Sequence, residues 1–182
     1  MPPRDFSRLS PAEADAYLRE RLATAPGRLA AFRREVAATG GPAEEELDGL
    51  PESLVPLWEW FLRREGNRGD AERGGPPPDW YEPDPPEVGG ERLSPATLRD
   101  LDGIATYLPE VFLHELPESE WIVGHAPPAA RYVAQGKPVL RLPHGEELDP
   151  VKVAYALGVR VALYGEGRKP DALLAAYRAW LP

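Results

Sequence analysis

The stretch from Asp149 to Gly165 constrains the fold of this chain most, because it predicts a helix that is apolar over most of its circumference. Asp149 is suited to cap this helix, Pro150 to occupy its first turn and Gly165 to end it. The helix is roughly 22 Å long at 1.5 Å per residue, and within it only Lys152 and Arg160 are charged. We therefore expect it to be buried on most sides, although it is too short to span a bilayer.

Valines and one glycine inside this stretch bear on how it packs. The β-branched valines leave a central strand as the alternative, but the length and both capping signals favour a helix. Gly158 lies near the middle, where glycine costs about 1 kcal/mol relative to alanine. The sequence therefore predicts that the backbone of another segment packs closely against this position.

The composition is that of one folded domain without cysteine chemistry. The chain of 182 residues is long enough for one hydrophobic core with a helical appendage. Hydrophobic residues make up 42% of it and five residues are tryptophan, which argues against global disorder. The absence of cysteine excludes a disulfide framework, a thiolate metal site and a cysteine nucleophile. The first residues lack the apolar run of a signal peptide, so we expect a cytoplasmic protein.

The net charge of -9 is concentrated in the middle of the chain. Residues 1–39 carry +2, residues 40–130 carry -14 and residues 131–182 carry +3. A field of negative sign repels nucleic acid and anionic membranes, and it attracts a basic protein. We therefore expect a basic protein as the partner, and neither nucleic acid nor a membrane.

Residues 1–65 are expected to form an N-terminal helical region. Ser10 and Glu13 have the spacing of a capping box, which starts one helix. Pro26 is suited to start a second helix, which ends at Gly40. These two helices would pack as a hairpin.

Residues 54–64 predict a short helix that contains two tryptophans. Trp58 and Trp60 are two positions apart, so their side chains point about 200° apart around the helix. The helix is therefore either covered on two sides, or it leaves one indole at the surface as a contact for a partner.

Residues 66–92 form a Pro/Gly-rich linker, whose composition excludes a helix or a central strand. Trp80 and Tyr81 interrupt this composition, and their aromatic rings have a reason to dock. We expect the first third of the linker to be mobile and the Trp80–Tyr81 part to pack in extended form along the domain surface. The alternative is that these two residues form a docking peptide for a partner.

Residues 93–182 are expected to form an α+β core, in which a small antiparallel sheet packs on helices and the N-terminal helices add a further layer. Helical spacing continues from Pro95 to Leu116, and Pro109 inside it predicts a kink or a break. Residues 170–181 predict a final amphipathic helix.

Short β-type runs lie between these helices, at residues 120–124, 131–133 and 137–142. Their close spacing favours antiparallel pairing, because a parallel pair needs a long connection. Gln135 and Gly136 predict a turn between the last two runs.

The candidates for chemistry are the three histidines and one glutamate. Glu110 and His114 are four positions apart, so a continuous helix places both on one face, as in a metal-binding or acid–base pair. His125 and His144 fall in predicted loops, and they would complete a zinc-type set with the first pair if all four converge. The alternative is that all three histidines are surface or capping residues. No phosphate-binding or serine-nucleophile motif is present, and we predict no cofactor.

These features favour a non-catalytic acidic protein-binding module, such as an inhibitor or immunity-type protein that neutralises a basic partner. The alternatives are a metal-assisted hydrolase that uses the Glu110/His114 face, and a domain that binds a small apolar ligand between the kinked helix and the sheet. The acidic run at residues 44–48 lacks the ligand spacing of a calcium loop. The residues predicted to contact a partner are Glu44, Glu45, Glu46, Asp48, Trp60, Trp80, Tyr81, Glu118 and Glu120.

Overall fold

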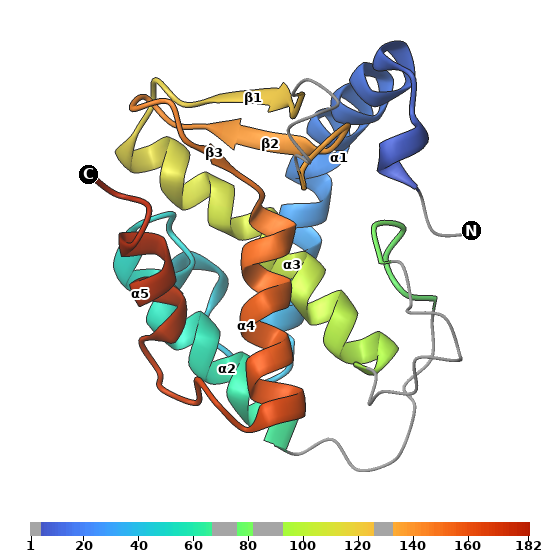
Figure 1. Cartoon of the computed structure of the whole chain (residues 1–182). Helices are drawn as coiled ribbons and strands as arrows, with labels where there is room; N and C mark the ends of the chain where they lie inside the picture. The colour runs from blue at the N-terminus through green and yellow to red at the C-terminus, as the bar shows by residue number, and fades with distance from the viewer. Residues whose placement is uncertain (1–4, 67–75, 82–92, 126–132) are drawn as a thin grey trace.

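The computed structural model describes residues 5–66, 76–81, 93–125 and 133–182. Within these ranges the chain has five α-helices and one three-stranded antiparallel sheet, which confirms the predicted α+β class. The helices form the bulk of the molecule, and the sheet lies along one side of them (Figure 1).

The N-terminal part of the chain forms one long helix, α1 (Pro11–Ala38), so the predicted hairpin is wrong. Ser10 caps this helix through the expected capping box with Glu13. Pro26 lies inside the helix, and both Pro26 and Leu22 are exposed. Because proline has no N–H, the carbonyl of Leu22, four residues earlier, lacks its usual donor. Because that carbonyl lies on the solvent side, the proline does not have to end the helix. A short 3-10 helix, η1 (Phe6–Arg8), precedes α1.

Helix α2 (Leu54–Gly66) contacts both α3 and α5, and it buries both of its tryptophans. Trp58 is fully buried and Trp60 is 1% exposed, which confirms that this helix is covered on two sides. The Trp60 ring meets Phe32 of α1 edge to face at 5.8 Å, and its indole nitrogen donates to Thr39 Oγ1 at 2.9 Å. Trp60 is therefore a core residue, and its prediction as a partner contact is wrong. Two 3-10 helices lead into α2: η2 (Glu44–Glu46) and η3 (Pro51–Ser53).

Helix α3 (Pro95–Glu115) lies in the middle of the helical layer and is the most buried element. It starts at Ser94, whose hydroxyl accepts from the backbone N–H of Thr97 at 3.0 Å. The helix continues through Pro109 without a break. This confirms the predicted helix and shows that the alternative of a helix broken at Pro109 is wrong. Gly103 allows α1 to approach closely, because a Cβ there would lie 2.9 Å from Cγ of Phe32.

The sheet is antiparallel, as predicted, and its strands lie in the order β1–β2–β3. β1 (Glu120–Val123) pairs with β2 (Pro138–Arg141) in a register that places Trp121 opposite Leu140. Gly136 makes the predicted turn before β2 with a φ of 72°, a conformation that favours glycine. Of the run predicted at 131–133, the first two residues lie outside the described ranges, and Val133 is in a turn. The third strand is instead β3 (Glu147–Leu148), which is too short to leave a periodic signal.

The central helix of the sequence analysis is α4 (Pro150–Tyr164), with the expected side-chain cap from Asp149 and with Gly165 in the left-handed conformation at its end. Its burial is narrower than predicted, because only Pro150, Ala154, Gly158 and Val161 are buried. Most of the other apolar positions are half-buried, so α4 covers the core with one face. Gly158 meets the side chain of Leu101 on α3, where a backbone had been expected. Helix α5 (Ala172–Arg178) follows and buries Leu173, Leu174 and Tyr177.

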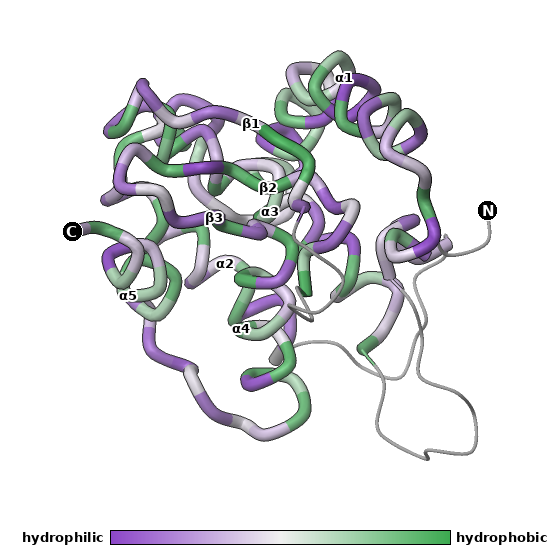
Figure 2. Tube along the Cα trace, turned by 45° about the horizontal axis from the view of Figure 1, so that its top comes forward, coloured by the Kyte–Doolittle hydropathy of each residue, from purple (hydrophilic) through white to green (hydrophobic). Residues whose placement is uncertain are grey.

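One hydrophobic core joins the N-terminal helical region to residues 93–182. It extends from Phe32 and Val36 of α1 through α2 and α3 to Tyr177 of α5. Figure 2 shows hydrophilic and hydrophobic residues interleaved along α1, as expected for a helix that keeps several faces in solvent. The N-terminal helices therefore act as a layer of the same core.

Candidate functional site

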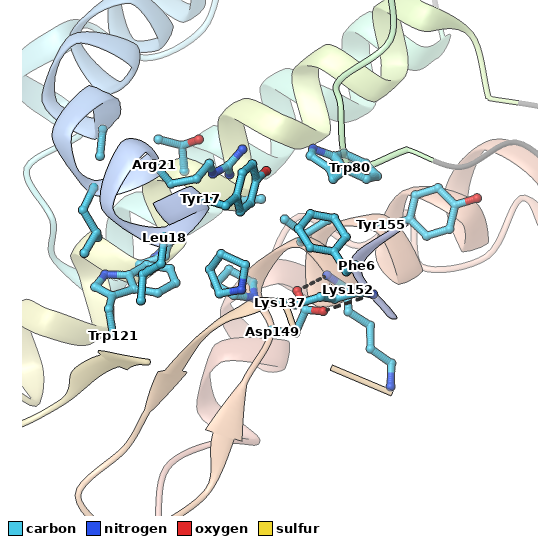
Figure 3. Close-up of a pocket in the computed structure, with 18 of the residues that line it drawn as sticks. Phe6, Tyr17, Leu18, Arg21, Trp80, Trp121, Lys137, Asp149, Lys152 and Tyr155 are labelled. Carbon is cyan, nitrogen blue, oxygen red and sulfur yellow. Dashed lines mark hydrogen bonds and ion pairs between the residues drawn. The ribbon is translucent and has the colours of Figure 1, made fainter. Parts of the chain in front are cut away.

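A cavity of about 830 Å³ lies between α1, α3, the first turn of α4 and the sheet (Figure 3). The turn formed by residues 79–81 covers part of it, and η1 contributes Phe6 at another edge. The residues that line it include Phe6, Tyr17, Leu18, Arg21, Leu22, Ala25, Arg28, Trp80, Tyr81, Glu110, Trp121, Gln135, Lys137, Asp149, Lys152 and Tyr155.

Aromatic side chains form much of the cavity wall. Phe6 meets Tyr17 edge to face at 5.1 Å, and Trp80 meets Tyr155 of α4 edge to face at 5.9 Å. Trp121 of β1 lies beside Leu18 at the other end in Figure 3. Rings with these contacts offer flat apolar surfaces to a ligand and lose little conformational entropy when one binds.

The turn at residues 79–81 is docked, and two polar contacts hold it. The indole nitrogen of Trp80 donates to Oδ1 of Asp102 at 2.8 Å, and the Tyr17 hydroxyl lies 3.3 Å from Oδ1 of Asp79. Tyr81 donates its backbone N–H to the carbonyl of Pro78 at 3.1 Å. The segment is therefore a turn here, and the predicted extended form is wrong. The expected mobile first third of the linker lies outside the described residues.

Asp102 of α3 is the main anionic group behind the cavity. Its Oδ2 accepts from Nη2 of Arg28 at 2.6 Å, and its Oδ1 accepts from Trp80. Arg21 approaches the same carboxylate, with Nη1 3.7 Å from Oδ1. Two guanidinium groups from α1 therefore share one carboxylate.

A second group of charges lies where the sheet meets α4. Asp149 caps α4 by accepting the N–H of Lys152 at 3.0 Å, and Lys137 Nζ is 3.8 Å from its other oxygen (Figure 3). Gln135 also lines the cavity, and its amide nitrogen lies 2.9 Å from Nδ1 of His125.

Glu110 lines the cavity, but its carboxylate already pairs with an arginine. Nη2 of Arg33 donates to Oε1 of Glu110 at 2.8 Å. The second oxygen, Oε2, is buried and has no hydrogen-bond partner among the described residues. His114 is exposed and is not among the residues that line the cavity. Glu110 therefore lines the cavity as the partner of Arg33, whereas His114 lies outside the lining.

The histidines do not converge on a metal site within the described residues. Across residues 5–66, 76–81, 93–125 and 133–182, no three His, Asp or Glu side chains lie close enough to hold a metal ion. His125 contacts Gln135, and His144 lies 3.7 Å from Glu146 in the turn between β2 and β3. The predicted loops exist, but they leave the three rings in separate places.

The acidic run at residues 44–48 is an ordered, exposed loop. Glu44, Glu45, Glu46 and Asp48 are all exposed. Glu46 accepts the N–H of Ala43 at 2.7 Å, and Asp48 accepts that of Leu50 at 2.9 Å, so both cap local turns.

Two buried anchors hold this loop against the core. Arg33 donates from Nε and Nη2 to the carbonyl of Leu47, and the Tyr107 hydroxyl accepts the N–H of Gly49 at 2.9 Å. The same hydroxyl lies 2.6 Å from Ser53 Oγ. Burial raises the pKa of Tyr107, against smaller opposing effects of Ser53 and Gly49, so the hydroxyl stays protonated.

Several carboxylates of the acidic middle are neutralised within the fold. Asp100, Asp102 and Glu110 pair with arginines of α1 and α2, and Glu120 lies 3.1 Å from Arg141 of the neighbouring strand. Glu118 is exposed and has no ion pair in the described part of the chain.

The sequence reading did not identify most residues of the cavity. Trp80, Tyr81 and Glu110 were among the candidate residues, but Tyr17, Arg21 and Arg28 of α1 were not. Arg21 follows Tyr17 by four positions and Arg28 follows Arg21 by seven, and this helical spacing was the available signal for one common face.

Comparison with protein-family models, with curated proteins and with solved structures found no match to this chain. In the ranges that the structure describes, no helix combines the length and the apolar character needed to cross a lipid bilayer.

Proposed function

We propose that the protein binds a small, largely apolar molecule in the cavity between α1, α3 and the sheet. The observation that carries this proposal is the cavity itself, whose volume of about 830 Å³ falls within the range of about 300–1,000 Å³ typical of ligand sites. Six aromatic residues line it, and charged side chains of both signs lie in the same lining. This combination supports binding, and the described lining contains no histidine to act as a general base.

The aromatic wall supports recognition of a flat or branched hydrocarbon body. Trp80 and Tyr155 contact each other edge to face, and Phe6 and Tyr17 lie in the same part of the cavity in Figure 3. Leu18 and Trp121 extend the apolar surface to the other end. Covering the exposed parts of these side chains with a ligand contributes about 25 cal/mol for each Å² of apolar surface removed from water.

Binding of N-phenyl-1-naphthylamine, an uncharged dye that fluoresces in apolar surroundings, tests the proposal. We expect saturable binding of one dye per chain and a higher Tm in its presence. Ala25→Trp places an indole in the cavity and should weaken dye binding at least about tenfold, which corresponds to 1.4 kcal/mol. Ala23→Trp is the matched control, because Ala23 is exposed on the same helix and does not line the cavity.

Two results would contradict the proposal. One is a dye signal that does not saturate. The other is an affinity that Ala25→Trp leaves unchanged, since the dye would then bind outside the cavity.

We propose as a second candidate that a basic protein in the cytoplasm binds the acidic end of the molecule. The acidic end comprises the exposed residues Glu44, Glu45, Glu52, Glu115 and Glu118. None of them forms an ion pair with another described residue, unlike the inward-facing carboxylates of α3. Unpaired surface charge of one sign steers an oppositely charged partner and speeds its association.

Capture from a lysate at low and at high salt tests this second candidate. We expect a basic protein that is released as the salt concentration rises, and that Glu44→Gln/Glu45→Gln/Glu118→Gln does not capture. Asp15→Asn/Glu20→Gln/Glu166→Gln changes the net charge equally at exposed positions elsewhere, and it should capture normally. Capture that resists salt, or that both triple variants weaken alike, would argue against the acidic end.

A further inference from the structure

Arg21 brings an incompletely neutralised guanidinium to the cavity (Figure 3). The nearest carboxylate, that of Asp102, already accepts Arg28 at 2.6 Å and the Trp80 indole at 2.8 Å. Arg21 Nη1 is 3.7 Å from this carboxylate, which is beyond hydrogen-bonding distance. Among the described residues, Arg21 has no other polar contact than this ion pair and its position 6.0 Å from the Tyr17 ring centroid. Its N–H groups are therefore available to a ligand.

Lys137 brings a second cation to the cavity, from the segment just before β2. Its Nζ lies 3.8 Å from Asp149, which is also longer than a hydrogen bond. Asp149 is committed to the cap of α4, where it accepts the N–H of Lys152. The ammonium of Lys137 thus keeps donors that Asp149 does not satisfy.

The carboxylates that line the cavity all have partners. Asp5 accepts from Ser7 and lies 2.9 Å from Arg8, and Glu110 accepts from Arg33. Asp149 caps α4. The second oxygen of Glu110, Oε2, has no partner among the described residues, but it is buried and its carboxylate is already paired with Arg33. A cationic ligand would therefore meet Arg21 and Lys137 while these carboxylates are paired or committed to caps, and electrostatic repulsion would oppose its binding. An anionic group would instead be attracted by both cations and could accept hydrogen bonds from them.

We infer that the ligand is an organic acid whose carboxylate pairs with Arg21 while its apolar body lies among the aromatic rings of the cavity. This inference rests on the proposed small-molecule function and names the chemical class of the ligand. A guanidinium fits a carboxylate with two parallel N–H···O hydrogen bonds, and such charge-assisted bonds are stronger than neutral ones. The half-buried position of Arg21, with 21% of its side chain exposed, limits screening of the pair by water.

Displacement of bound N-phenyl-1-naphthylamine by a matched acid and amide tests this inference. 1-Naphthaleneacetate and 1-naphthaleneacetamide share one ring system and differ in the carboxylate. We expect the acid to bind at least about tenfold more tightly than the amide. Arg21→Gln should remove this preference by weakening the acid about tenfold, while the affinity for the amide stays the same. Arg19→Gln removes the same charge from an exposed position of α1 that does not line the cavity, and it should change neither affinity.

Three results would overturn the inference: equal affinities for the acid and the amide, a preference for the acid that survives Arg21→Gln, or failure of both compounds to displace a dye that binds. In each of these cases the dye still binds, so the small-molecule function stands while the ligand class is wrong. Absence of dye binding itself would overturn the proposed function. The unchanged affinity of the amide shows that Arg21→Gln retains its fold.

Discussion

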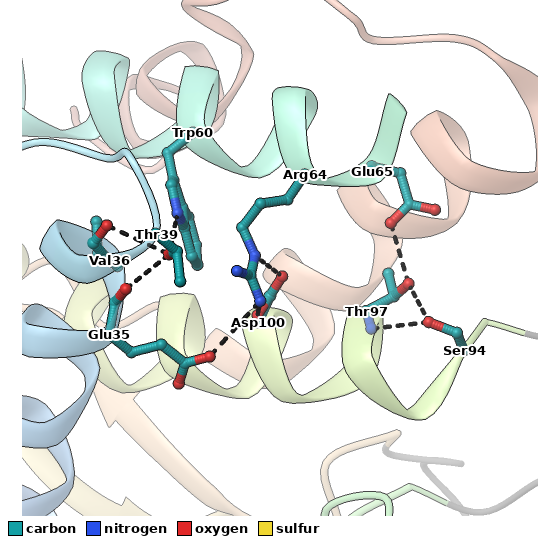
Figure 4. A network of polar contacts seen from close by, with 9 residues as sticks. All are labelled: Glu35, Val36, Thr39, Trp60, Arg64, Glu65, Ser94, Thr97 and Asp100. Carbon is teal, nitrogen blue, oxygen red and sulfur yellow. Dashed lines mark hydrogen bonds and ion pairs between the residues drawn. The ribbon is translucent and has the colours of Figure 1, made fainter. Parts of the chain in front are cut away.

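Replacing Arg64 with methionine tests whether the contact between α2 and α3 depends on a buried ion pair. Arg64 donates from Nε to Oδ2 of Asp100 at 2.9 Å and from Nη2 to Oδ1 at 3.2 Å (Figure 4). Asp100 is 3% exposed, whereas 26% of the Arg64 side chain is accessible. The guanidinium also lies 5.0 Å from the Trp60 ring centroid and 3.6 Å from Oε1 of Glu35. Arg64 thus connects three helices.

The size of the effect follows from the burial of Asp100. Arg64→Met keeps an apolar side chain of similar length but removes two hydrogen bonds from a buried carboxylate. Losing one partner of a buried ion pair costs about 3–5 kcal/mol of unfolding free energy. The partial exposure of Arg64 lets water reach the carboxylate, so we expect the lower end, about 3 kcal/mol. For a chain of this size that lowers Tm by about 6–12 °C.

Urea unfolding followed by tryptophan fluorescence measures this effect, because Trp58 and Trp60 are buried. Arg63→Met is the matched control. Arg63 is exposed and donates to the carbonyl of Gly40 at 2.9 Å, so its loss should cost less than about 1 kcal/mol. The double variant Arg64→Met/Asp100→Leu also removes the buried carboxylate of Asp100, and it should be about 2 kcal/mol more stable than Arg64→Met alone. A cost below about 1 kcal/mol for Arg64→Met, or a double variant as unstable as the sum of its single variants, would refute the argument.

The remaining predictions concern packing, a buried hydroxyl and metal binding. Gly158→Ala should destabilise the protein by about 1–3 kcal/mol, because its Cβ would lie 2.7 Å from Cδ2 of the fully buried Leu101. Gly27→Ala should stabilise the protein by about 0.5–1 kcal/mol, because a Cβ at this position meets nothing within 4 Å. Thermal melts of both variants check the contrast. Tyr177→Phe should raise the stability at neutral pH, because the Tyr177 hydroxyl is buried without a hydrogen-bond partner among the described residues. Burial, with smaller effects of two nearby glutamates, raises the pKa of Tyr177 from 10.0 to about 12, so the unfolded chain ionises first and stability falls between these pH values; urea unfolding below and above pH 10 should show a smaller fall in Tyr177→Phe. Zinc should leave Tm unchanged, since no three ligand side chains converge in the described ranges.

Local capping signals explain why the sequence predicted most helices correctly. Ser10, Ser94 and Asp149 each accept a backbone N–H from the residue three positions later, as their spacing indicated. These interactions form within one turn, so they depend on neighbouring residues and little on the rest of the fold. The antiparallel order of the strands was predictable for a similar reason, because short connections permit few topologies.

Non-local effects explain the errors. Pro26 reads as a helix start, and only the solvent exposure of that part of α1 lets the helix continue through it. The apolar circumference of α4 indicated burial on most sides, but the core closes against one face of it. The cavity combines α1 with residues about 60 to 130 positions later in the chain, and helical periodicity identifies a buried face without identifying what lies opposite.

The ion pairs between the α3 carboxylates and arginines of α1 and α2 also bear on the proposed functions. The sequence assigned one continuous acidic field to the middle of the chain, whereas Asp100, Asp102 and Glu110 are each neutralised by an arginine from an earlier helix. This pairing neutralises the α3 carboxylates, whereas the glutamates of the acidic end form no ion pair with another described residue. On α1, Arg21 lies beside Asp102 as its second cation after Arg28, and Arg21 also lines the cavity. The same arrangement of arginines thus gives the molecule an anionic outer surface and a cationic position inside an apolar cavity. Substitutions at the acidic end and at Arg21 should therefore act independently, because they alter different parts of one charge distribution.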